Sequence, residues 1–391
     1  MAFTDYGTII TSHTLNKTYY KGQFLKGHEQ FLVFDQFAER QDNMNIPVNQ
    51  GDTVQFTRVA PFDMSRTALT EGTNPNATKI YANKVQATVA EYGAVVNPSK
   101  KYWYTNMDSK LAETSRKLGE SAAKTIDSLI WEAVAEGGVG LRADLDTGYS
   151  KQDACASGCT TTSIILDALP TSIGSADTGV IVFLSGTNTG ISRAFTYSDT
   201  NTVTVSALDN APSDGDIVWV CSTEGITDAD EVSAALIQRS VALMQRWGVP
   251  TFEDGYYHAI YSPYQKYDFQ RDSEWVNLKH EAAPKDLYRN LDGEIYGVRF
   301  HTDNNPYLHT AGTIGTYVST ADVYCLSIFG KGAFGNVHVE GLDRKFYINP
   351  PESSNTNALG MYGTIGWYEL CAPVVLDGSF IINIFNVPTL Q

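Results

Sequence analysis

The chain has 391 residues, 42% of them hydrophobic and 12% aromatic, and its 44 acidic and 28 basic residues give a formal net charge of −16 at pH 7. A domain usually takes about 100–200 residues, so this length predicts roughly two to four units with a sizeable core. Such an acidic chain is poorly suited to neutralising phosphates, which argues against direct binding to nucleic acid or to an anionic membrane.

Residues 1–50 are predicted to form an N-terminal arm. The opening MAFTDYGTII has no basic segment followed by an apolar run, so no signal peptide is expected, and no apolar run in the chain approaches a membrane span. Further on, HEQFLVFDQFAER places Phe31, Phe34 and Phe37 on one side of a short helix. We expect this helix to pack on the chain's own core or, in part, on a neighbouring subunit.

Residues 51–96 contain the pattern of a long β-hairpin. TVQFTRV alternates with Val54 and Phe56 on one face, and the returning strand KIYANKVQATVAEYGAVV places Tyr81, Val85 and Val89 on one face. These strands are too polar for a central sheet, and a two-stranded hairpin of this length is marginal in water by itself. We therefore expect the hairpin to lie on another surface, with a partner subunit as the natural candidate.

The longest predicted helix runs from Thr105 to Gly138. We expect Thr105 to cap its first turn, with Asp108 completing a weak capping box, and Gly137-Gly138 to stop it in the left-handed conformation. An apolar stripe follows helical spacing, namely Leu111, Leu118, Ala122, Ile126, Leu129, Ile130, Ala133 and Val134. The polar face carries Lys110, Glu113, Arg116, Lys117, Glu120 and Lys124. A rod of about 45 Å should lie along one face of a broad body.

Residues 141–226 are rich in Ser, Thr, Gly and Asp and poor in helix signals. Short strands separated by turn residues predict a small β-barrel or β-sandwich inserted as a unit. Cys155 and Cys159 are four positions apart, but no second pair and no nearby His completes a zinc set. We expect reduced thiols in a cytoplasm.

Helical patterning returns after residue 227, where Asp228 and Glu231 have capping-box spacing and Gly248 ends the helix. The strand YYHAIYSP, the helix YQKYDFQRD and several apolar strands are predicted to follow. In the last segment, Asp377-Gly378 between apolar strands predicts a hairpin that returns to the core sheet beside the long helix.

Catalytic and cofactor patterns are weak. His301-x-Asp303 with His338 downstream could hold a non-haem iron, because two histidines and a carboxylate suit that metal, but so short a triplet recurs by chance. Gly330-Lys331-Gly332 lacks the ending of a phosphate loop. We expect no enzyme activity, no cofactor and no metal.

Four segments of the second half carry a resemblance. They are GYYHAIYSPYQKYD at 255–268, EIYGVRF at 294–300, DVYCLSIFGKGAFG at 322–335 and GTIGW at 363–367. In this order, with the long helix upstream, they resemble the major capsid proteins of tailed bacteriophages, which have the Hong Kong ninety-seven fold. The resemblance covers most of residues 229–391.

The resemblance implies an α+β capsid fold. Its parts would be an N-terminal arm (1–50), an extended β-hairpin loop (51–100), the spine helix of a peripheral domain (101–140), an axial domain (227–340) and the return strands of the peripheral domain (341–391). The segment 141–226 departs from members that pass directly from the spine helix to the next helix, and it would be an inserted small all-β domain.

The implied function is that of a structural coat protein. It would self-assemble into hexamers and pentamers of an icosahedral phage head that encloses double-stranded DNA without sequence-specific binding. Its partners would be copies of itself, a portal, a scaffold and decoration proteins, and it would reside in the virion after assembly in the host cytoplasm. Lys79 and Lys84 are candidate donors for the covalent cross-link found in some relatives.

The implied assembly interface places the hairpin of one subunit over the spine helix of its neighbour. Its expected residues are Val54, Phe56, Arg58, Tyr81, Val85, Val89, Arg116, Lys117 and Glu120. The expected fold-motif residues are Gly363, Gly366, Trp367, Asp377 and Gly378.

Other functions remain open at this point. The shell protein of a bacterial encapsulating compartment shares the fold but holds enzymes instead of a genome. A non-haem metal enzyme using His301, Asp303 and His338 would belong to a different class, and bound metal would support it. A tail-tube protein would form filaments rather than closed shells.

Overall fold

The computed structural model describes most of the chain. The described residues are 19–29, 31–39, 44–47, 51–62, 68–69, 71–72, 74, 77, 79–105, 110–143, 149–174, 177–222, 226, 231–282, 293–304, 312–314, 317–319, 323–341, 344–353 and 357–389. The chain folds into two compact units whose segments alternate along the sequence. Unit 1 consists of Met1–Val54, Ala87–Ile130 and Asn336–Pro373, and unit 2 of Gln55–Gln86, Trp131–Gly335 and Val374–Gln391.

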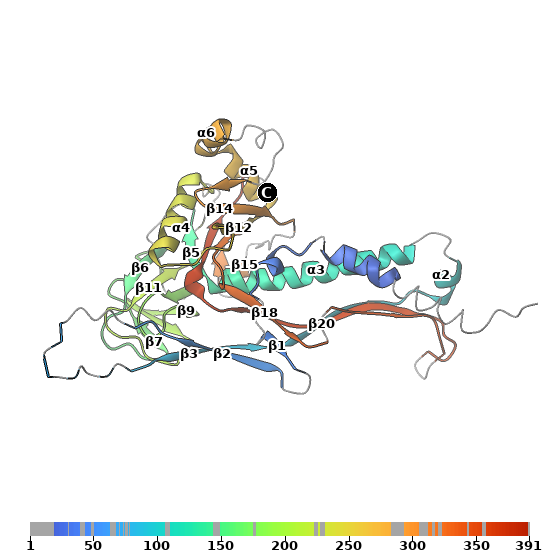
Figure 1. The fold of residues 1–391 in the computed structure, drawn as a ribbon, viewed down its shortest axis with the longest axis horizontal. Helices are drawn as coiled ribbons and strands as arrows, with labels where there is room; N and C mark the ends of the chain where they lie inside the picture. Colours follow the sequence, from blue (N-terminus) through green and yellow to red (C-terminus); the bar gives the residue numbers. More distant parts are fainter. Residues whose placement is uncertain are drawn as a thin grey trace, which may run out of the picture. The chain divides into compact units, whose positions relative to one another are not determined.

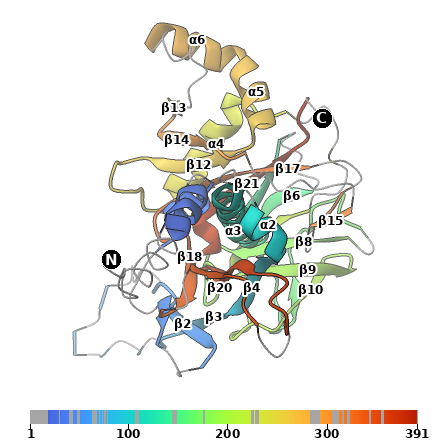
Figure 2. The same cartoon turned by 90° about the vertical axis from the view of Figure 1, so that its right-hand side faces the viewer.

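Unit 1 is a sheet covered by helices on one face (Figures 1 and 2). Its strands run in the order β1 (Asn45–Ile46), β18 (Phe334–Val339), β20 (Thr364–Val375) and β19 (Lys345–Asn349), and β4 (Ala90–Val96) also pairs with β20. The core joins α3 (Lys110–Gly137) and the helix of residues 19–29 to this sheet through Phe24, Leu111, Leu118, Ala122, Ile348, Ile365 and Trp367. Hydrophobic burial on this one face fixes the strand register.

The helix of residues 19–29 crosses α3 at two glycines. A Cβ on Gly27 would overlap with the carbonyl oxygen of Arg116, and a Cβ on Gly119 would overlap with that of Phe24. The two backbones therefore approach to a distance that only glycine permits at these positions.

The helix predicted over HEQFLVFDQFAER is wrong. The described helix covers 19–29 and so includes only the first two residues of the predicted segment, whose phenylalanines lie instead in and around a 3-10 turn, η1 (Phe34–Gln36). The backbone amides of Val33 and Phe34 donate to Asp127 Oδ1 on α3 at 3.0 and 2.8 Å. This carboxylate takes the amides at the start of the turn, so the segment is held to α3 rather than continued as a helix.

The apolar stripe predicted for α3 is confirmed in its main positions. Leu111, Leu118, Ala122, Ile126, Ile130 and Val134 are buried. Leu129 and Ala133 are half-buried. The predicted start is wrong, because Thr105 ends a separate helix, α2 (Lys100–Thr105), where its hydroxyl donates to Lys101 O at 2.7 Å. Asp108 lies outside the described residues.

The C-terminus of α3 is at Gly137, close to the predicted stop, but its mechanism differs. Neither Gly137 nor Gly138 has a positive φ, so no left-handed residue ends the helix. A Cβ on Gly138 would lie 2.5 Å from Asn383 Nδ2. That amide donates to Val134 O and Ala135 O at 2.8 and 3.1 Å. The glycine thus makes room for a side chain that caps the helix.

Unit 2 contains a mixed six-stranded sheet. Its order is β13 (Glu294–Ile295), β14 (Val298–Thr302), β12 (Tyr257–Tyr261), β17 (Tyr324–Phe329), β21 (Ile381–Asn386) and β5 (Val139–Arg142). The helices of this unit are α4 (Ala234–Arg246), α5 (Pro263–Arg271) and α6 (Ser273–Ala282). Ser233 caps α4 by accepting from Leu236 N, whereas the predicted cap Asp228 lies outside the described residues.

Residues 150–221 of unit 2 form a closed antiparallel β-barrel. Its strands run in the order β6 (Ser150–Ala154), β11 (Ile217–Cys221), β8 (Thr178–Phe183), β9 (Ser192–Asp199), β10 (Thr202–Val205) and β7 (Ser163–Ile165). A bridge between Cys155 and Leu166 joins the first strand to the last. Asp167 N donates to Ala154 O across the same seam at 2.9 Å. The small all-β unit predicted here is therefore a barrel rather than a sandwich.

Residues 51–96 do not form one hairpin. β2 (Thr53–Val59) pairs with β3 (Ala82–Thr88) as predicted. The chain beyond Val89 forms β4, which pairs with β20 in the sheet of unit 1. The remaining strands described, β15 (Gly312–Ile314) and β16 (Tyr317–Ser319), pair with each other.

The hairpin predicted at Asp377-Gly378 is wrong. β20 and β21, which flank this pair, belong to two different sheets. Asp377 instead caps the 3-10 turn η3 (Gly378–Phe380) by accepting from Ser379 N. A hairpin pattern in the sequence therefore marks a passage between sheets, because each strand finds its partners elsewhere in the chain.

Candidate functional site

The residues considered as metal ligands do not come together. His301 Nε2, on β14, lies 2.8 Å from His258 Nδ1 on β12. His338 Nδ1, on β18, lies 3.6 Å from Glu369 Oε1 on β20. Asp303 is buried and donates its backbone amide to Tyr261 O at 3.1 Å. Among the residues that the structure describes, no group of three His, Cys, Asp or Glu side chains could hold a metal ion. His301, Asp303 and His338 therefore do not form a metal site in the described part of the chain.

Charged and aromatic side chains surround the His258–His301 pair. His258 Nε2 is 3.3 Å from Asp254 Oδ2, and Arg299 Nη1 is 2.5 Å from the same oxygen. Phe252 packs edge-on against the His258 ring, with 4.6 Å between centroids. Burial lowers the pKa of His258, and attraction to Asp254 opposes this shift only in part. The neutral imidazole is thus favoured, and a single proton can be shared between the two rings.

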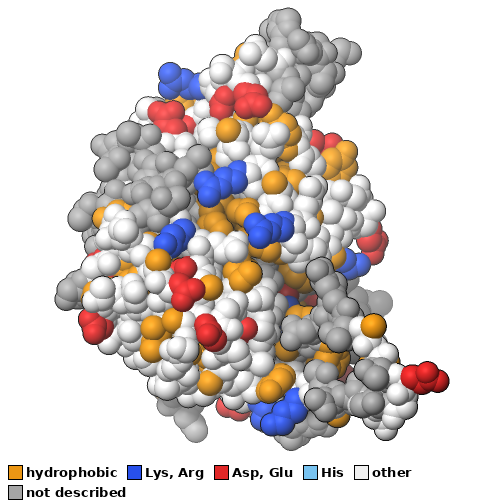
Figure 3. Space-filling model, turned by 90° about the vertical axis from the view of Figure 1, so that its left-hand side faces the viewer, with side chains coloured by type: hydrophobic (Ala, Val, Ile, Leu, Met, Phe, Trp, Pro, Cys, Tyr) orange, Lys and Arg blue, Asp and Glu red, His pale blue; other side chains and the backbone are white. Residues whose placement is uncertain are grey.

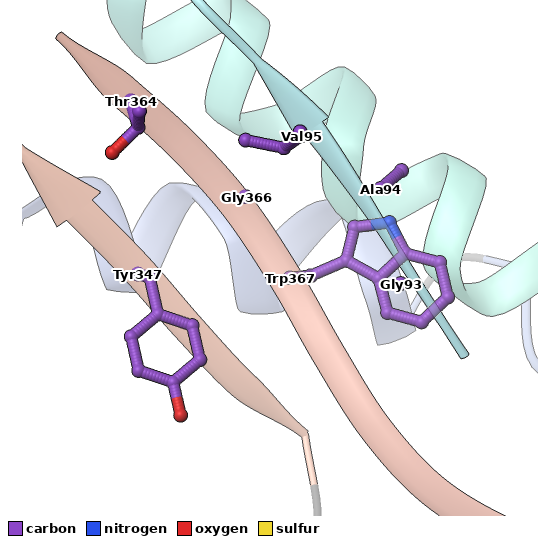
Figure 4. A pocket seen from close by; sticks show the side chains of 7 residues that line it. All are labelled: Gly93, Ala94, Val95, Tyr347, Thr364, Gly366 and Trp367. Carbon is purple, nitrogen blue, oxygen red and sulfur yellow. The ribbon is translucent and has the colours of Figure 1, made fainter. Parts of the chain in front are cut away.

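A hollow of about 240 Å³ lies on the sheet of unit 1 (Figure 4). Its lining residues come from three strands: Gly93, Ala94 and Val95 of β4, Tyr347 of β19, and Thr364, Gly366 and Trp367 of β20. The register places Gly366 directly between Tyr347 and Val95. Because side chains alternate along a strand, this row points away from the core face that carries Ile348 and Ile365. The hollow forms where a glycine separates two apolar side chains.

The glycines of this hollow also meet backbone. A Cβ on Gly366 would lie 2.9 Å from Ala94 O, and a Cβ on Gly93 would lie 2.8 Å from Trp367 O. Gly363, at the start of the same motif, is as tightly placed, because its Cβ would lie 2.8 Å from Asn349 O and from the Trp103 ring. The motif GTIGW thus places its two glycines against neighbouring backbone, and it also shapes a surface, which spacing alone did not indicate.

Large apolar side chains around the hollow are exposed in the described part of the chain. Val95 is 64% exposed and Tyr347 is 49% exposed. The pairing continues past β4, since Lys100 N donates to Met361 O at 2.6 Å. Further exposed apolar residues of this unit are Val96, Tyr102, Tyr104, Leu359, Met361 and Tyr362. Apolar patches of this kind are typical of surfaces that contact another protein.

The predicted hairpin residues point to their own chain. Val54, Phe56, Arg58 and Val89 are half-buried, alternating with exposed neighbours. Val85 packs against the core of the β-barrel. Arg58 Nη2 lies 2.5 Å from Asp377 Oδ2. The inner face of β2–β3 therefore packs in part on this chain, and the interface role expected for these residues stays a prediction.

The outer end of the hairpin is uncovered. Val59, Phe62 and Ile80 are each more than half exposed, and Tyr81 is 39% exposed. Leu69, in the connection between the strands, is 69% exposed. We call these five residues the hairpin tip. They give a second set of exposed apolar side chains among the described residues.

The predicted polar track on α3 is partly covered. Arg116 Nη1 lies 2.9 Å from Glu120 Oε1, and Lys117 Nζ lies 2.7 Å from Glu120 Oε2. Glu120 was expected on the polar face of the helix, as part of the assembly interface, but it is only 8% exposed. The neighbouring Gly119 is the point where the helix of residues 19–29 crosses. This part of α3 therefore bears the chain's own N-terminal helix, and a neighbour's arm could lie only on what remains.

The surface charges suit a protein contact better than a nucleic-acid contact. Figure 3 shows one face on which the basic side chains of the described residues are separated by acidic and apolar ones. No helix among the described residues is long and apolar enough to span a bilayer. The net charge of −16 is likewise unfavourable for a contact with phosphates.

Comparisons with known proteins agree on the fold. No protein-family profile matches the chain, and no curated protein matches it. The capsid structure of cyanophage P-SCSP1u matches with a TM-score of 0.53 at 12% identity, over 89% of this chain and 88% of the other. The capsid of Ralstonia phage GP4 matches with 0.51 at 14% identity, over 92% and 91%. The capsid of cyanophage Pam1 matches with 0.50 at 17% identity, over 92% of each chain.

Proposed function

We propose that this chain, which has the fold of phage capsid proteins, is the major capsid protein of a tailed phage. The observation that carries the proposal is the extent of the likeness, which in one case covers 92% of this chain and 91% of the other. Copies would form hexamers and pentamers of an icosahedral shell around double-stranded DNA. A portal and a scaffold would be its partners, and decoration proteins could bind the finished shell.

Two features of the chain support an assembly role. The hairpin tip and the hollow are both apolar and uncovered. In a closed symmetric shell, many weak contacts of this kind add up to high stability while each one stays reversible during assembly. The net charge of −16 suits a container that must not adhere to the DNA it packages and releases.

The tip and the hollow are complementary, and we place them against each other between neighbouring subunits. Phe62 and Ile80 offer large apolar side chains. The row Tyr347, Gly366 and Val95 offers a hollow of about 240 Å³. Filling it would remove apolar surface from water at about 25 cal/mol per Å². The contact would link capsomers non-covalently.

Electron microscopy of the purified chain tests the function. With a scaffold supplied, closed icosahedral shells built of hexamers and pentamers are expected. A persistent monomer at high concentration would refute the proposal. Filaments would indicate a tail tube, and shells that carry enzymes instead of DNA in the native host would indicate an encapsulating compartment.

A pair of variants tests the proposed contact. Val95→Asp places a charge at the rim of the hollow, and we expect a folded subunit that fails to form shells, because an unpaired charge in an apolar contact is costly. Thr204→Asp makes a matched change at an exposed strand position of the barrel, and normal shells are expected. Normal assembly of the Val95 variant would show that the hollow is not an interface.

A second pair addresses the tip. Phe62→Ser with Ile80→Ser removes two exposed apolar side chains and should leave the subunit folded but defective in assembly. Thr57→Ser, at an exposed position of β2, serves as the control. Shells of normal yield from the double variant would exclude the tip as the linking element.

A further inference from the structure

The hairpin β2–β3 is joined to loops of the barrel by hydrogen bonds. Asn83 is 1% exposed. Its Nδ2 donates to Thr187 O at 2.6 Å, in the β8–β9 loop. Its Oδ1 accepts from Asn210 Nδ2 at 2.9 Å, in the β10–β11 loop. On the next residue, Lys84 N donates to Asp209 Oδ2 at 2.7 Å. Two neighbouring residues of β3 are thus hydrogen-bonded to two loops of the barrel.

The barrel loops are themselves braced for this contact. Asn188 Nδ2 donates to Asn210 O at 2.9 Å, which ties the β8–β9 loop to the β10–β11 loop. Asn188 is 1% exposed. The two loops that carry the hydrogen-bond partners of Asn83 are therefore also joined to each other.

A separate ion pair holds the other strand. Arg58 of β2 lies 2.5 Å from Asp377 through Nη2 and Oδ2, and its guanidinium carbon lies 6.0 Å from the centre of the Phe380 ring. Gly190 of the β8–β9 loop leaves the space for this pair, since a Cβ there would overlap with both Arg58 Nη1 and Asp377 Oδ1. Gly190 also accepts from Gly378 N at 2.8 Å through its carbonyl oxygen.

An apolar contact lies between the two polar ones. Val85 packs against the barrel core. Along β3 the side chains of Asn83, Val85 and Ala87 face inward, and those of Lys84 and Gln86 are exposed. The polar and apolar contacts therefore belong to one continuous face of the hairpin.

We propose that the barrel is the binding surface for the hairpin of its own chain and sets the hairpin's direction before any second copy is present. A hairpin of two strands is marginal in water by itself. If it were ordered only on a neighbour, assembly would have to overcome that loss of conformational entropy at every contact. A hairpin already ordered on the barrel presents its tip without that cost. The role of this ordered hairpin in assembly rests on the proposed function, but the experiment that tests the ordering does not.

Hydrogen–deuterium exchange on the unassembled full-length subunit tests the proposal. In the wild type, peptides covering residues 53–60 and 81–88 should be protected. Asn83→Ala and Arg58→Met should each raise their exchange rate by about tenfold or more, because removed contacts lower the free energy of local opening. Thr57→Ala and Gln86→Ala, at exposed positions of the same strands, should leave exchange unchanged.

Exchange in β8 and β11 reports whether the barrel itself has stayed folded. A variant that also loses protection there is replaced by Asp209→Ala, which removes only the acceptor for Lys84 N. A double-mutant cycle of Arg58→Met with Asp377→Asn adds a test of the ion pair, since the second change in a true pair should add little to the first.

Fast exchange of the wild-type hairpin, or variants indistinguishable from the wild type, would overturn the proposal. Strictly additive effects in the cycle would overturn the ion pair as a fastening. Protection of the hairpin in a chain that never forms shells would leave this inference standing while refuting the proposed function. The two failures can therefore be told apart.

Discussion

Asn383 allows a direct measurement of how α3 is fastened to the sheet of unit 2. Its amide donates to Val134 O and Ala135 O, and its Oδ1 accepts from Ser327 Oγ at 2.8 Å. The residue is fully buried. Asn383→Ala removes three hydrogen bonds of about 1 kcal/mol each and strands buried polar groups, so we expect the free energy of unfolding to fall by about 3–4 kcal/mol.

A second variant separates donation from packing. Asn383→Asp keeps the size and the acceptor for Ser327 but cannot donate to the helix carbonyls, and it sets a negative charge at the negative end of the helix dipole. It should therefore destabilise the protein at least as much as Asn383→Ala. If capping did not matter, the Asp variant would resemble the wild type.

Urea unfolding of the unassembled subunit, followed by tryptophan fluorescence at one protein concentration, gives these values. Asn349→Ala is the matched control, because Asn349 is exposed on β19 and its Nδ2 donates only to Thr364 Oγ1, at 3.2 Å. It should change stability by less than about 0.5 kcal/mol. The reasoning is refuted if both Asn383 variants lie within about 1 kcal/mol of the wild type.

Three further outcomes are expected in the same assay. Gly119→Ala should destabilise by about 1–3 kcal/mol through overlap at the helix crossing, whereas Gly22→Ala, with open space around it, should stabilise by up to about 1 kcal/mol; equal effects would exclude the close crossing. Burial and Glu132 raise the pKa of Glu136, so the folded state binds that proton more tightly and wild-type stability gains as pH falls through the folded pKa. Glu136→Gln should therefore stabilise by about 0.2–0.5 kcal/mol at pH 7 and lose this advantage in acid; an advantage that persists in acid would contradict the assignment. The pKa of His258 is lowered, so its contribution is present at neutral pH and is lost as pH drops below about 6.5, the unfolded value; His258→Gln should flatten the dependence of stability on pH between 7 and 5.

The periodicity of apolar residues was sufficient to predict elements that can pack against any apolar surface. The stripe of α3 could be predicted because any apolar surface satisfies Leu118 or Ile126, and the barrel could be predicted because turn residues mark the ends of its strands. The same reasoning failed for Glu120. Spacing places it opposite the stripe, but a second helix crosses there at Gly119, and a covered polar face has the same pattern as a solvated one.

The buried polar contacts could not be predicted from residue spacing, because they join residues far apart in the sequence. Asn383 meets Val134 across 249 positions, and Asn83 meets Asn210 across 127. An Asn in the middle of an apolar strand was the available signal at Asn383, and it indicates that a buried partner exists without identifying it. The hollow is similar, because Gly93 and Gly366 become neighbours only through the pairing of β4 with β20.

The bridge between Cys155 and Leu166, which joins the first and last strands of the barrel, matters when many copies of the chain lie close together. An unpaired edge strand is a template on which a strand of another molecule can add, and proteins held side by side at high local concentration are most exposed to that error. The first and last strands of the barrel meet at this bridge and at the hydrogen bonds beside it, so part of each edge strand is already paired within the barrel. Many copies of this module can then stand next to one another without cross-pairing, and the choice of partner is left to side chains, whose contacts can be made and broken until the correct arrangement is reached.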